Sequence, residues 1–239
     1  MRVVCEATSS TANQNLIQQF LQSLPNAQQH SLANYQAEQT PGSAFSRRTF
    51  FSLPFQVSYT GTCLRTIPYG SPDKAPLVLI SQLLTHNFLH PEIREKGGAY
   101  GASASTGSTS DLFTMSSYRD PNPKNSLSTY QKAGQYAVDK AWTERELEES
   151  KLSVFQSIDA PTSVSSDGSK EFTYGITQDM DQQMRESLLG VTKNDIQRVA
   201  QKYLVEAKED DISTAILGEP KSWIKDDKSW NVKTLNISA

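Results

Sequence analysis

The segment from His90 to Ala104 holds the residues of this chain that are best suited to catalysis. Arg94 ends a predicted helix, two glycines turn the chain, and Tyr100 begins a predicted strand whose next members are all small. A guanidinium and a phenol that converge on one place can bind a peptide carbonyl or stabilise a developing oxyanion. The small side chains would also let an extended peptide approach and pair along the strand. The alternative is structural, with Arg94 at a helix terminus and Tyr100 filling a contact between helix and strand.

Two of the three histidines, His86 and His90, lie four residues apart on the same predicted helix, so both imidazoles could reach one metal ion. A zinc peptidase also needs a glutamate general base between them, in the order H-E-x-x-H or H-x-x-E-H. Asn87 and Leu89 occupy the two positions where that glutamate would stand. A metal centre further needs a third ligand and supporting hydrogen bonds. The sequence therefore predicts no metal bound by this chain, and tightly bound zinc in the purified protein would support the opposite interpretation.

The charge balance of the chain excludes several classes of partner. Its 239 residues carry 23 Lys and Arg against 26 Asp and Glu, a net charge of −3, whereas proteins that bind duplex nucleic acid or anionic membranes usually carry a basic excess. No apolar run approaches the roughly 18–20 residues of a membrane helix, and no signal segment opens the chain. We therefore expect no nucleic-acid partner and no membrane partner.

The two cysteines, Cys5 and Cys63, are too few for a disulfide framework and favour a reducing compartment.

Composition divides the chain into three parts. Residues 1–25 combine an apolar, β-branched segment, Arg2 to Ala7, with a helical pattern that stops at Pro25, and they predict a strand–helix lead-in. Residues 26–47 are rich in Gln, Asn, Ser and Ala without a visible period, and they predict a polar linker. Residues 48–239 hold the other predicted strands and helices, and we expect them to form one domain.

In this domain the predicted strands arrive mostly in pairs and the predicted helices in groups. That order predicts an α+β fold in which helices pack on one face of a mostly antiparallel sheet. Pro54 indicates an edge or a bulge in the first strand, and Thr143 with Glu146 forms a capping box. The polar tail from Glu219 is assigned no element. The predicted strands are 49–60, 62–69, 99–106, 111–118 and 212–217, and the predicted helices are 71–94, 125–141, 143–158, 170–188 and 192–204.

The stretch from Ile93 to Gly101, IREKGGAYG, resembles the signature of the non-zinc half of the pitrilysin-type metallopeptidases. In that family, the sequence is similar to the C-terminal region of the branch that degrades presequences in mitochondria. The likeness covers most of the chain from about Phe50 to Trp223, and residues 2–24 resemble the junction between neighbouring domains. The other matching stretches are LRTIPY (64–69), NFLHPEIREKGGAYGAS (87–103), SSYRDPNP (116–123), ESKLSVFQSIDAP (149–161), FTYGITQDM (172–180) and ILGEP (216–220).

The resemblance implies a peptidase built from four similar α+β domains, whose two halves close around a chamber. The zinc and its H-x-x-E-H motif belong to the first domain, and the last domain reaches across the chamber with an Arg and a Tyr, which match Arg94 and Tyr100 here. By resemblance, the Tyr100 hydroxyl holds the scissile carbonyl as it becomes an oxyanion, and Arg94 orients the substrate backbone. The implied cofactor is zinc in the intact enzyme. The implied partners are peptide substrates and the N-terminal zinc-bearing half, and the implied location is the mitochondrial matrix.

Two functional hypotheses follow from these observations. In the first, the chain is the substrate-binding half of a zinc metalloendopeptidase that degrades presequences and other short unstructured peptides. In the second, it is a non-catalytic structural domain of the same fold, as in core subunits of a respiratory complex. The presence of both Arg94 and Tyr100 favours the first, because a scaffold needs neither residue. Since the sequence contains no H-x-x-E-H motif, we expect the isolated chain to fold without metal and to lack peptidase activity.

Overall fold

The computed structural model of the protein describes residues 2–24, 47–107 and 109–235. The chain divides into two compact units, one built from residues 1–45 and 161–177 and the other from residues 46–160 and 178–239. The predicted linker at 26–47 lies almost wholly outside the described residues, so the boundary at its end stays a prediction. No helix of the described residues combines the length and the apolar character needed to span a bilayer.

In the first unit, the helix predicted near the start of the chain is confirmed as α1 (Ser10–Ser23), which follows the 3₁₀ turn η1 (Ala7–Ser9). The strand predicted from Arg2 to Ala7 is wrong, because residues 2–6 are irregular and Val3 and Val4 are exposed. A β-branched segment becomes a strand only where a neighbouring strand takes up its backbone groups. The described residues of this unit contain no such neighbour. Instead, the Arg2 guanidinium donates hydrogen bonds to the carbonyls of Ser165 and Asp167.

The helix predicted over residues 170–188 is in fact two helices. The first, α5 (Ser169–Tyr174), belongs to the first unit with the 3₁₀ turn η3 (Val164–Ser166), and the second, α6 (Gln178–Gly190), belongs to the second unit. Gly175 ends α5 in the left-handed region at φ 70°, and its N–H donates to the Glu171 carbonyl at 2.8 Å. Glycine adopts this conformation without the steric cost that other residues meet, so it stops the helix here.

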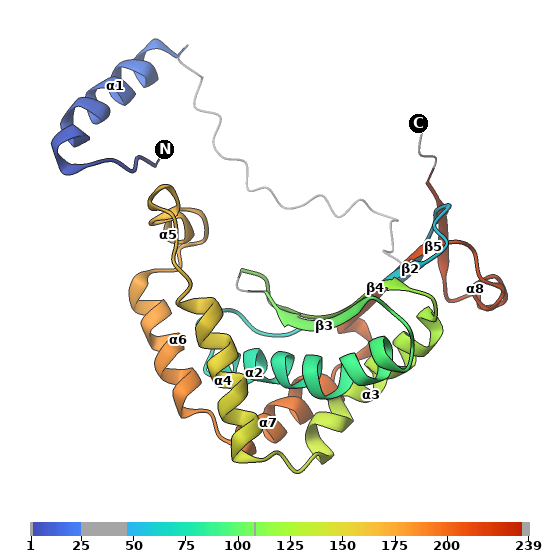
Figure 1. The fold of residues 1–239 in the computed structure, drawn as a ribbon. Helices are drawn as coiled ribbons and strands as arrows, with labels where there is room; N and C mark the ends of the chain where they lie inside the picture. The colour runs from blue at the N-terminus through green and yellow to red at the C-terminus, as the bar shows by residue number, and fades with distance from the viewer. Residues whose placement is uncertain (1, 25–46, 108, 236–239) are drawn as a thin grey trace. The chain divides into compact units, whose positions relative to one another are not determined.

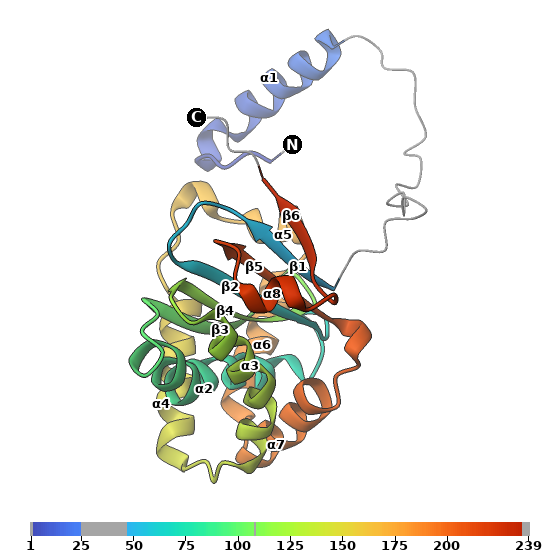
Figure 2. The same ribbon diagram turned by 90° about the vertical axis from the view of Figure 1, so that its right-hand side faces the viewer.

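The second unit is built on a six-stranded sheet with the order β3-β4-β2-β5-β1-β6. Three pairs of neighbouring strands are antiparallel, namely β3 with β4, β4 with β2 and β2 with β5, while β1 runs parallel to both β5 and β6. The predicted mostly antiparallel sheet is thereby confirmed. The strands are β1 (Arg48–Ser52), β2 (Ser58–Arg65), β3 (Gly101–Thr106), β4 (Leu112–Asp120), β5 (Ile212–Gly218) and β6 (Asn231–Thr234). Figure 2 shows β6 beside β1.

Two of the predicted strands need correction, and the tail needs an addition. The single strand predicted over 49–60 is split into β1 and β2 by the irregular residues 53–57, which contain Pro54. A proline has no N–H for the ladder, so it falls naturally between two strands. The strand predicted over 62–69 is the second half of β2. The tail from Glu219, to which the sequence assigned no element, forms α8 (Ser222–Asp226) and β6, and Trp230 just before β6 is buried.

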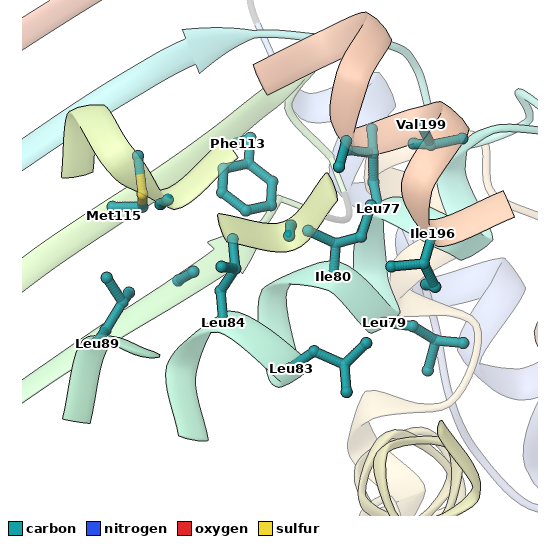
Figure 3. Close-up of a cluster of buried hydrophobic side chains, with 14 of the residues drawn as sticks. Leu77, Leu79, Ile80, Leu83, Leu84, Leu89, Phe113, Met115, Ile196 and Val199 are labelled. Atoms are coloured by element: carbon teal, nitrogen blue, oxygen red, sulfur yellow. The ribbon is translucent and has the colours of Figure 1, made fainter. Parts of the chain in front are cut away.

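The helices α2, α3, α4 and α7 lie on the same side of the sheet, as predicted (Figure 1). Successive side chains of a strand point to opposite faces of the sheet. The ones that face the helices are buried, and they include Ala102 and Ala104 of β3 and Phe113 and Met115 of β4. Figure 3 shows Phe113 among the leucines of α2. The helical elements of this layer are α2 (Lys74–Leu84), η2 (Thr85–Glu95), α3 (Pro123–Asp139), α4 (Glu144–Ile158), α7 (Lys193–Ala200), η4 (Gln201–Val205) and η5 (Glu209–Asp211). The capping box predicted at Thr143 is confirmed.

The buried carboxylate of Asp73 joins the start of α2 to the end of the α7 region. It accepts hydrogen bonds from Arg198 at 2.9 Å, from Lys202 at 3.0 Å and from the Tyr203 hydroxyl at 3.0 Å. Burial raises the pKa of Asp73, but the hydrogen bonds from Lys202, Arg198 and Tyr203 outweigh it and hold the pKa below its usual value of 3.8. Because the folded-state pKa is depressed, the stability that this carboxylate contributes is present above about pH 4 and is lost as the pH falls.

We therefore expect Asp73→Asn to lower the free energy of unfolding at pH 7 by about 1–2 kcal/mol, since hydrogen bonds to a charged group are lost. Urea unfolding of the chain at pH 7 and at pH 3 measures this difference, which should shrink at the lower pH because Asp73 becomes protonated in the unfolded state. Asp226→Asn, at an exposed carboxylate of α8, is the matched control and should change little at either pH. An Asp73→Asn penalty that grows as the pH falls would contradict this account.

Candidate functional site

Arg94 lies in the last turn of η2, a π-helix that continues directly from α2. The wide turns of this helix accommodate Pro91, which lacks an N–H, and the Lys96 N–H donates to the Pro91 carbonyl five residues earlier, at 3.1 Å. The neighbouring Ile93 is fully buried and anchors this turn in the core. The Arg94 side chain itself is exposed and has no ion-pair partner among the described residues. Its guanidinium is therefore available to a ligand.

A tight turn connects Arg94 to Tyr100. The Gly98 N–H donates to the Arg94 carbonyl at 3.0 Å, and the Ala99 N–H donates to the Ile93 carbonyl at 3.1 Å. Gly98 has a φ of 79°, which a side chain would disfavour, so the predicted role of the glycines in ending the helix is confirmed. The turn sets the two candidate residues at either end of one hydrogen-bonded segment.

Tyr100 comes one residue before β3 rather than inside the predicted strand 99–106, although its N–H already donates to the Tyr118 carbonyl of β4 at 3.1 Å. Its side chain is 71% exposed, and its hydroxyl has no hydrogen-bond partner among the described residues. The ring meets the Tyr118 ring edge-to-face, with 5.8 Å between centroids, and Tyr118 meets Tyr59 in the same way at 5.3 Å. The backbone of Tyr100 is thus fixed by the sheet while its phenol is free to donate a hydrogen bond.

The small-residue strand after Tyr100 is β3, which lies at the edge of the sheet. Ser103 and Ser105 are exposed, whereas Ala102 and Ala104 are buried. The Thr85 hydroxyl of η2 accepts a hydrogen bond from the Ala104 N–H at 2.8 Å, and its own proton is shared between the Ser81 carbonyl at 2.7 Å and the Ala104 carbonyl at 3.3 Å, with the shorter bond to Ser81. The Ala104 N–H is one of the groups that an added strand would need at this position. A peptide that paired along the strand would meet an occupied N–H at Ala104, and pairing along the rest of β3 stays a prediction.

The two histidines on η2 are close together, with 5.3 Å between the ring centroids of His86 and His90. Burial, the neighbouring His86 and the Arg94 charge lower the pKa of His90, so its imidazole is neutral at pH 7. A neutral imidazole is a suitable metal ligand, but no group of three or more His, Cys, Asp or Glu side chains in the described part of the chain could share one metal ion. The donor set of the described residues therefore does not fit a zinc site.

Two further residues, Asp120 at the end of β4 and Asn122 in the loop that follows, belong to this region but were not identified from the sequence. The Asn122 side-chain amide donates to the Gly97 carbonyl at 2.7 Å, across the turn that leads to Tyr100. Asp120 is 1% exposed, and it accepts hydrogen bonds from the Asn122 N–H at 2.7 Å and from the Ser126 hydroxyl at 2.5 Å. In the sequence these two residues lie in the stretch YRDPNP, between a predicted strand and a predicted helix. Such a stretch is typical of any turn, so it does not mark them as functional residues.

The sequence matches the family described as the PreP C-terminal domain over residues 48–218. It is 45% identical over 239 residues to the mitochondrial presequence protease of Aspergillus fumigatus, an alignment that covers 100% of this chain and 22% of the relative. It is 44% identical over 186 residues to the mitochondrial presequence protease of Xenopus tropicalis, covering 78% of this chain and 18% of the relative. The chain therefore spans about a fifth of the length of these curated relatives.

Solved structures share the fold at low sequence identity. Pitrilysin matches with a TM-score of 0.55 and 14% identity, covering 78% of this chain and 22% of that structure. The peptidase M16 inactive domain from Pseudomonas fluorescens matches with a TM-score of 0.55 and 17% identity, covering 73% of this chain and 44% of that structure. Sequence and fold agree, and the chain belongs to the PreP C-terminal domain family, within the pitrilysin-like fold.

Proposed function

We propose that this chain forms the substrate-binding C-terminal region of a zinc metalloendopeptidase that degrades presequences and other short unstructured peptides in the mitochondrial matrix. The observation that carries the proposal is its 45% identity, over the whole chain, to a mitochondrial presequence protease. The exposed Arg94 and Tyr100 side chains, at the two ends of one rigid turn, supply the groups that such a role requires.

In this proposal the Tyr100 hydroxyl donates a hydrogen bond to the scissile carbonyl as negative charge develops on its oxygen. The phenol suits this role because its backbone is fixed by β4 while its hydroxyl is free, so little reorganisation accompanies the reaction. The Arg94 guanidinium binds carbonyl groups of the peptide backbone before bond cleavage, because its planar fork can donate to two acceptors at once. Arg94 therefore contributes mainly to substrate affinity, and Tyr100 contributes mainly to the rate of the chemical step.

Zinc is proposed to belong to a separate N-terminal half of the intact enzyme, because the described residues of this chain offer no fitting donor set. That half is the proposed partner, together with peptide substrates, and the isolated chain is expected to be inactive. The alternative function is a non-catalytic structural domain of the same fold. The two functions differ in one respect that can be measured, since a structural domain tolerates the loss of the Arg94 and Tyr100 side chains without loss of peptide cleavage.

The test uses a hybrid enzyme in which this chain replaces the matching segment of the Aspergillus fumigatus relative. We expect the hybrid enzyme to cleave a fluorogenic presequence peptide. Arg94→Ala should raise KM about tenfold and lower kcat more modestly, because charge-assisted hydrogen bonds to the bound substrate are lost. Steady-state kinetics measure both constants.

Arg145→Ala, at an exposed arginine of α4 that pairs with Glu149, is the matched control and should leave both constants unchanged. An unaltered KM in the Arg94→Ala hybrid would remove the role assigned to Arg94. A folded, zinc-loaded hybrid that cleaves no peptide would contradict the proposed function, and so would cleavage by the isolated chain.

A further inference from the structure

Asn122 occupies the N-cap position of α3, but its side chain does not cap that helix. Asparagine is a preferred N-cap residue because its side-chain oxygen usually accepts a hydrogen bond from the first turn of the helix. In this structure the backbone carbonyl of Asn122, and not its side chain, accepts a hydrogen bond from the start of α3, from the Ser126 N–H at 3.2 Å. The side-chain amide instead donates to the Gly97 carbonyl, 25 residues earlier in the chain, at 2.7 Å. Capping of α3 therefore does not explain the use of this side chain.

The position of Asn122 is fixed by the buried carboxylate of Asp120. One carboxylate oxygen accepts from the Asn122 N–H at 2.7 Å, and the other accepts from the hydroxyls of Ser117 at 2.7 Å and Ser126 at 2.5 Å. The residue before it, Arg119, has a φ of 51°, in the left-handed region that non-glycine residues rarely adopt. Such a conformation persists where the surrounding contacts determine it. The loop after β4 is thus a rigid support for the Asn122 side chain.

The end of β4 and the loop after it run along the turn between Arg94 and Tyr100 and contact it at three points. The Asn122 amide bonds to the Gly97 carbonyl, and the Tyr118 carbonyl accepts from the Tyr100 N–H at 3.1 Å. Between them, a Cβ added to Gly98 would lie 3.5 Å from the Pro121 ring, which is ordinary van der Waals contact. Arg94 is held by its own helix, whereas the chain from Gly97 to Tyr100 is held from two sides, by the helix end through the Gly98 and Ala99 amides and by these contacts with β4 and its loop.

We propose that Asn122 is a positioning residue for catalysis, which fixes the turn at Gly97 so that the Tyr100 hydroxyl is presented in one orientation. The inference rests on the proposed function, because it assigns Asn122 a role through Tyr100. Asn122 itself touches no reacting group. Its loss is expected to reduce kcat and to spare KM, since substrate affinity is assigned to Arg94.

The discriminating variant is Asn122→Asp in the hybrid enzyme. Aspartate has nearly the same size and is an equally good N-cap residue, but its carboxylate cannot donate to the Gly97 carbonyl. We expect kcat to fall about five- to tenfold, as for the loss of one ordinary hydrogen bond, with KM within about twofold. Asn122→Ala should lower kcat similarly. Asn125→Asp, at an exposed neighbour in the first turn of α3, is the matched control and should leave kcat unchanged.

A double-mutant cycle with Tyr100→Phe tests whether Asn122 acts through the Tyr100 hydroxyl. If it does, Asn122→Asp has no further effect on kcat in the Tyr100→Phe background, whereas a general structural role gives the same loss in both backgrounds and overturns the inference. Hydrogen exchange at the Tyr100 amide supplies a readout besides activity, and it should accelerate in Asn122→Asp. If Tyr100→Phe alone leaves kcat unchanged, the catalytic role proposed for Tyr100 fails. Unchanged exchange in Asn122→Asp refutes the positioning role separately.

Discussion

Replacement of Tyr100 by phenylalanine is expected to lower kcat of the hybrid enzyme about 10²–10³-fold, the usual cost of removing one donor to a developing oxyanion. The ring is retained, so its edge-to-face contact with Tyr118 and the backbone hydrogen bond to β4 should persist. The effect should therefore fall on kcat and on kcat/KM alike, because the missing hydrogen bond forms only as charge develops. Steady-state kinetics with a fluorogenic presequence peptide measure it, and the zinc content should match that of the parent.

Tyr118→Phe is the matched control for this prediction. Tyr118 is 51% exposed and lies beside Tyr100, with 5.8 Å between the ring centroids, so it reports on the loss of a phenol from the same surface. We expect its kcat to stay within about twofold of the parent, since the proposed oxyanion contact belongs to Tyr100 alone. Equal losses in the two variants, or wild-type cleavage by Tyr100→Phe, would show that the Tyr100 hydroxyl has no special role.

Gly97→Ala should be the most damaging single-methyl change near the site. A Cβ at this position would lie 2.5 Å from the Ile93 carbonyl oxygen and 3.2 Å from the Glu92 carbonyl oxygen, and both are backbone atoms that cannot rotate away. The same Ile93 carbonyl accepts from the Ala99 N–H, so relief of the clash opens the turn. We expect the free energy of unfolding to fall by about 1–3 kcal/mol, as for overpacking, and kcat to fall at least tenfold.

Gly61→Ala controls for the general effect of replacing a glycine, because nothing lies within 4 Å of its added Cβ in β2. Its stability and kcat should match those of the parent. Urea unfolding of the chain and kinetics of the hybrid enzyme give the two readouts. A Gly97→Ala variant with parental stability and parental kcat would show that the turn is more adaptable than its contacts indicate.

Local signals in the sequence predicted most of the elements that support the candidate site. The glycine pair after Arg94 predicted the end of a helix, and the capping box at Thr143 predicted the start of another, because both signals act through neighbouring residues. Alternating small and polar residues after Tyr100 predicted β3 to within two residues. Residue types and positions singled out Arg94 and Tyr100 but left a structural role open, since both residue types are common on protein surfaces, and the family resemblance favoured the functional role.

Features that depend on distant segments could not be predicted. The segment Asn231–Thr234 becomes β6 because β1 lies beside it, and nothing in its own composition requires a strand. Residues 2–6 have strand-like composition but no neighbouring strand among the described residues of their unit. The Asn122 side chain could equally have capped α3. It bonds instead to the Gly97 carbonyl, which the fold brings next to it from an earlier part of the chain.

The hydroxyl of Thr85 has a consequence for self-association. Edge strands with unsatisfied amides are templates on which other copies of a protein aggregate, and natural proteins block them in specific ways. On β3, the Thr85 hydroxyl occupies the Ala104 N–H in the middle of the strand, so a second copy would meet an interrupted ladder there. Under the proposed function, β3 borders a surface open to unstructured peptides, and the occupied Ala104 amide makes this edge a poorer template for a second copy.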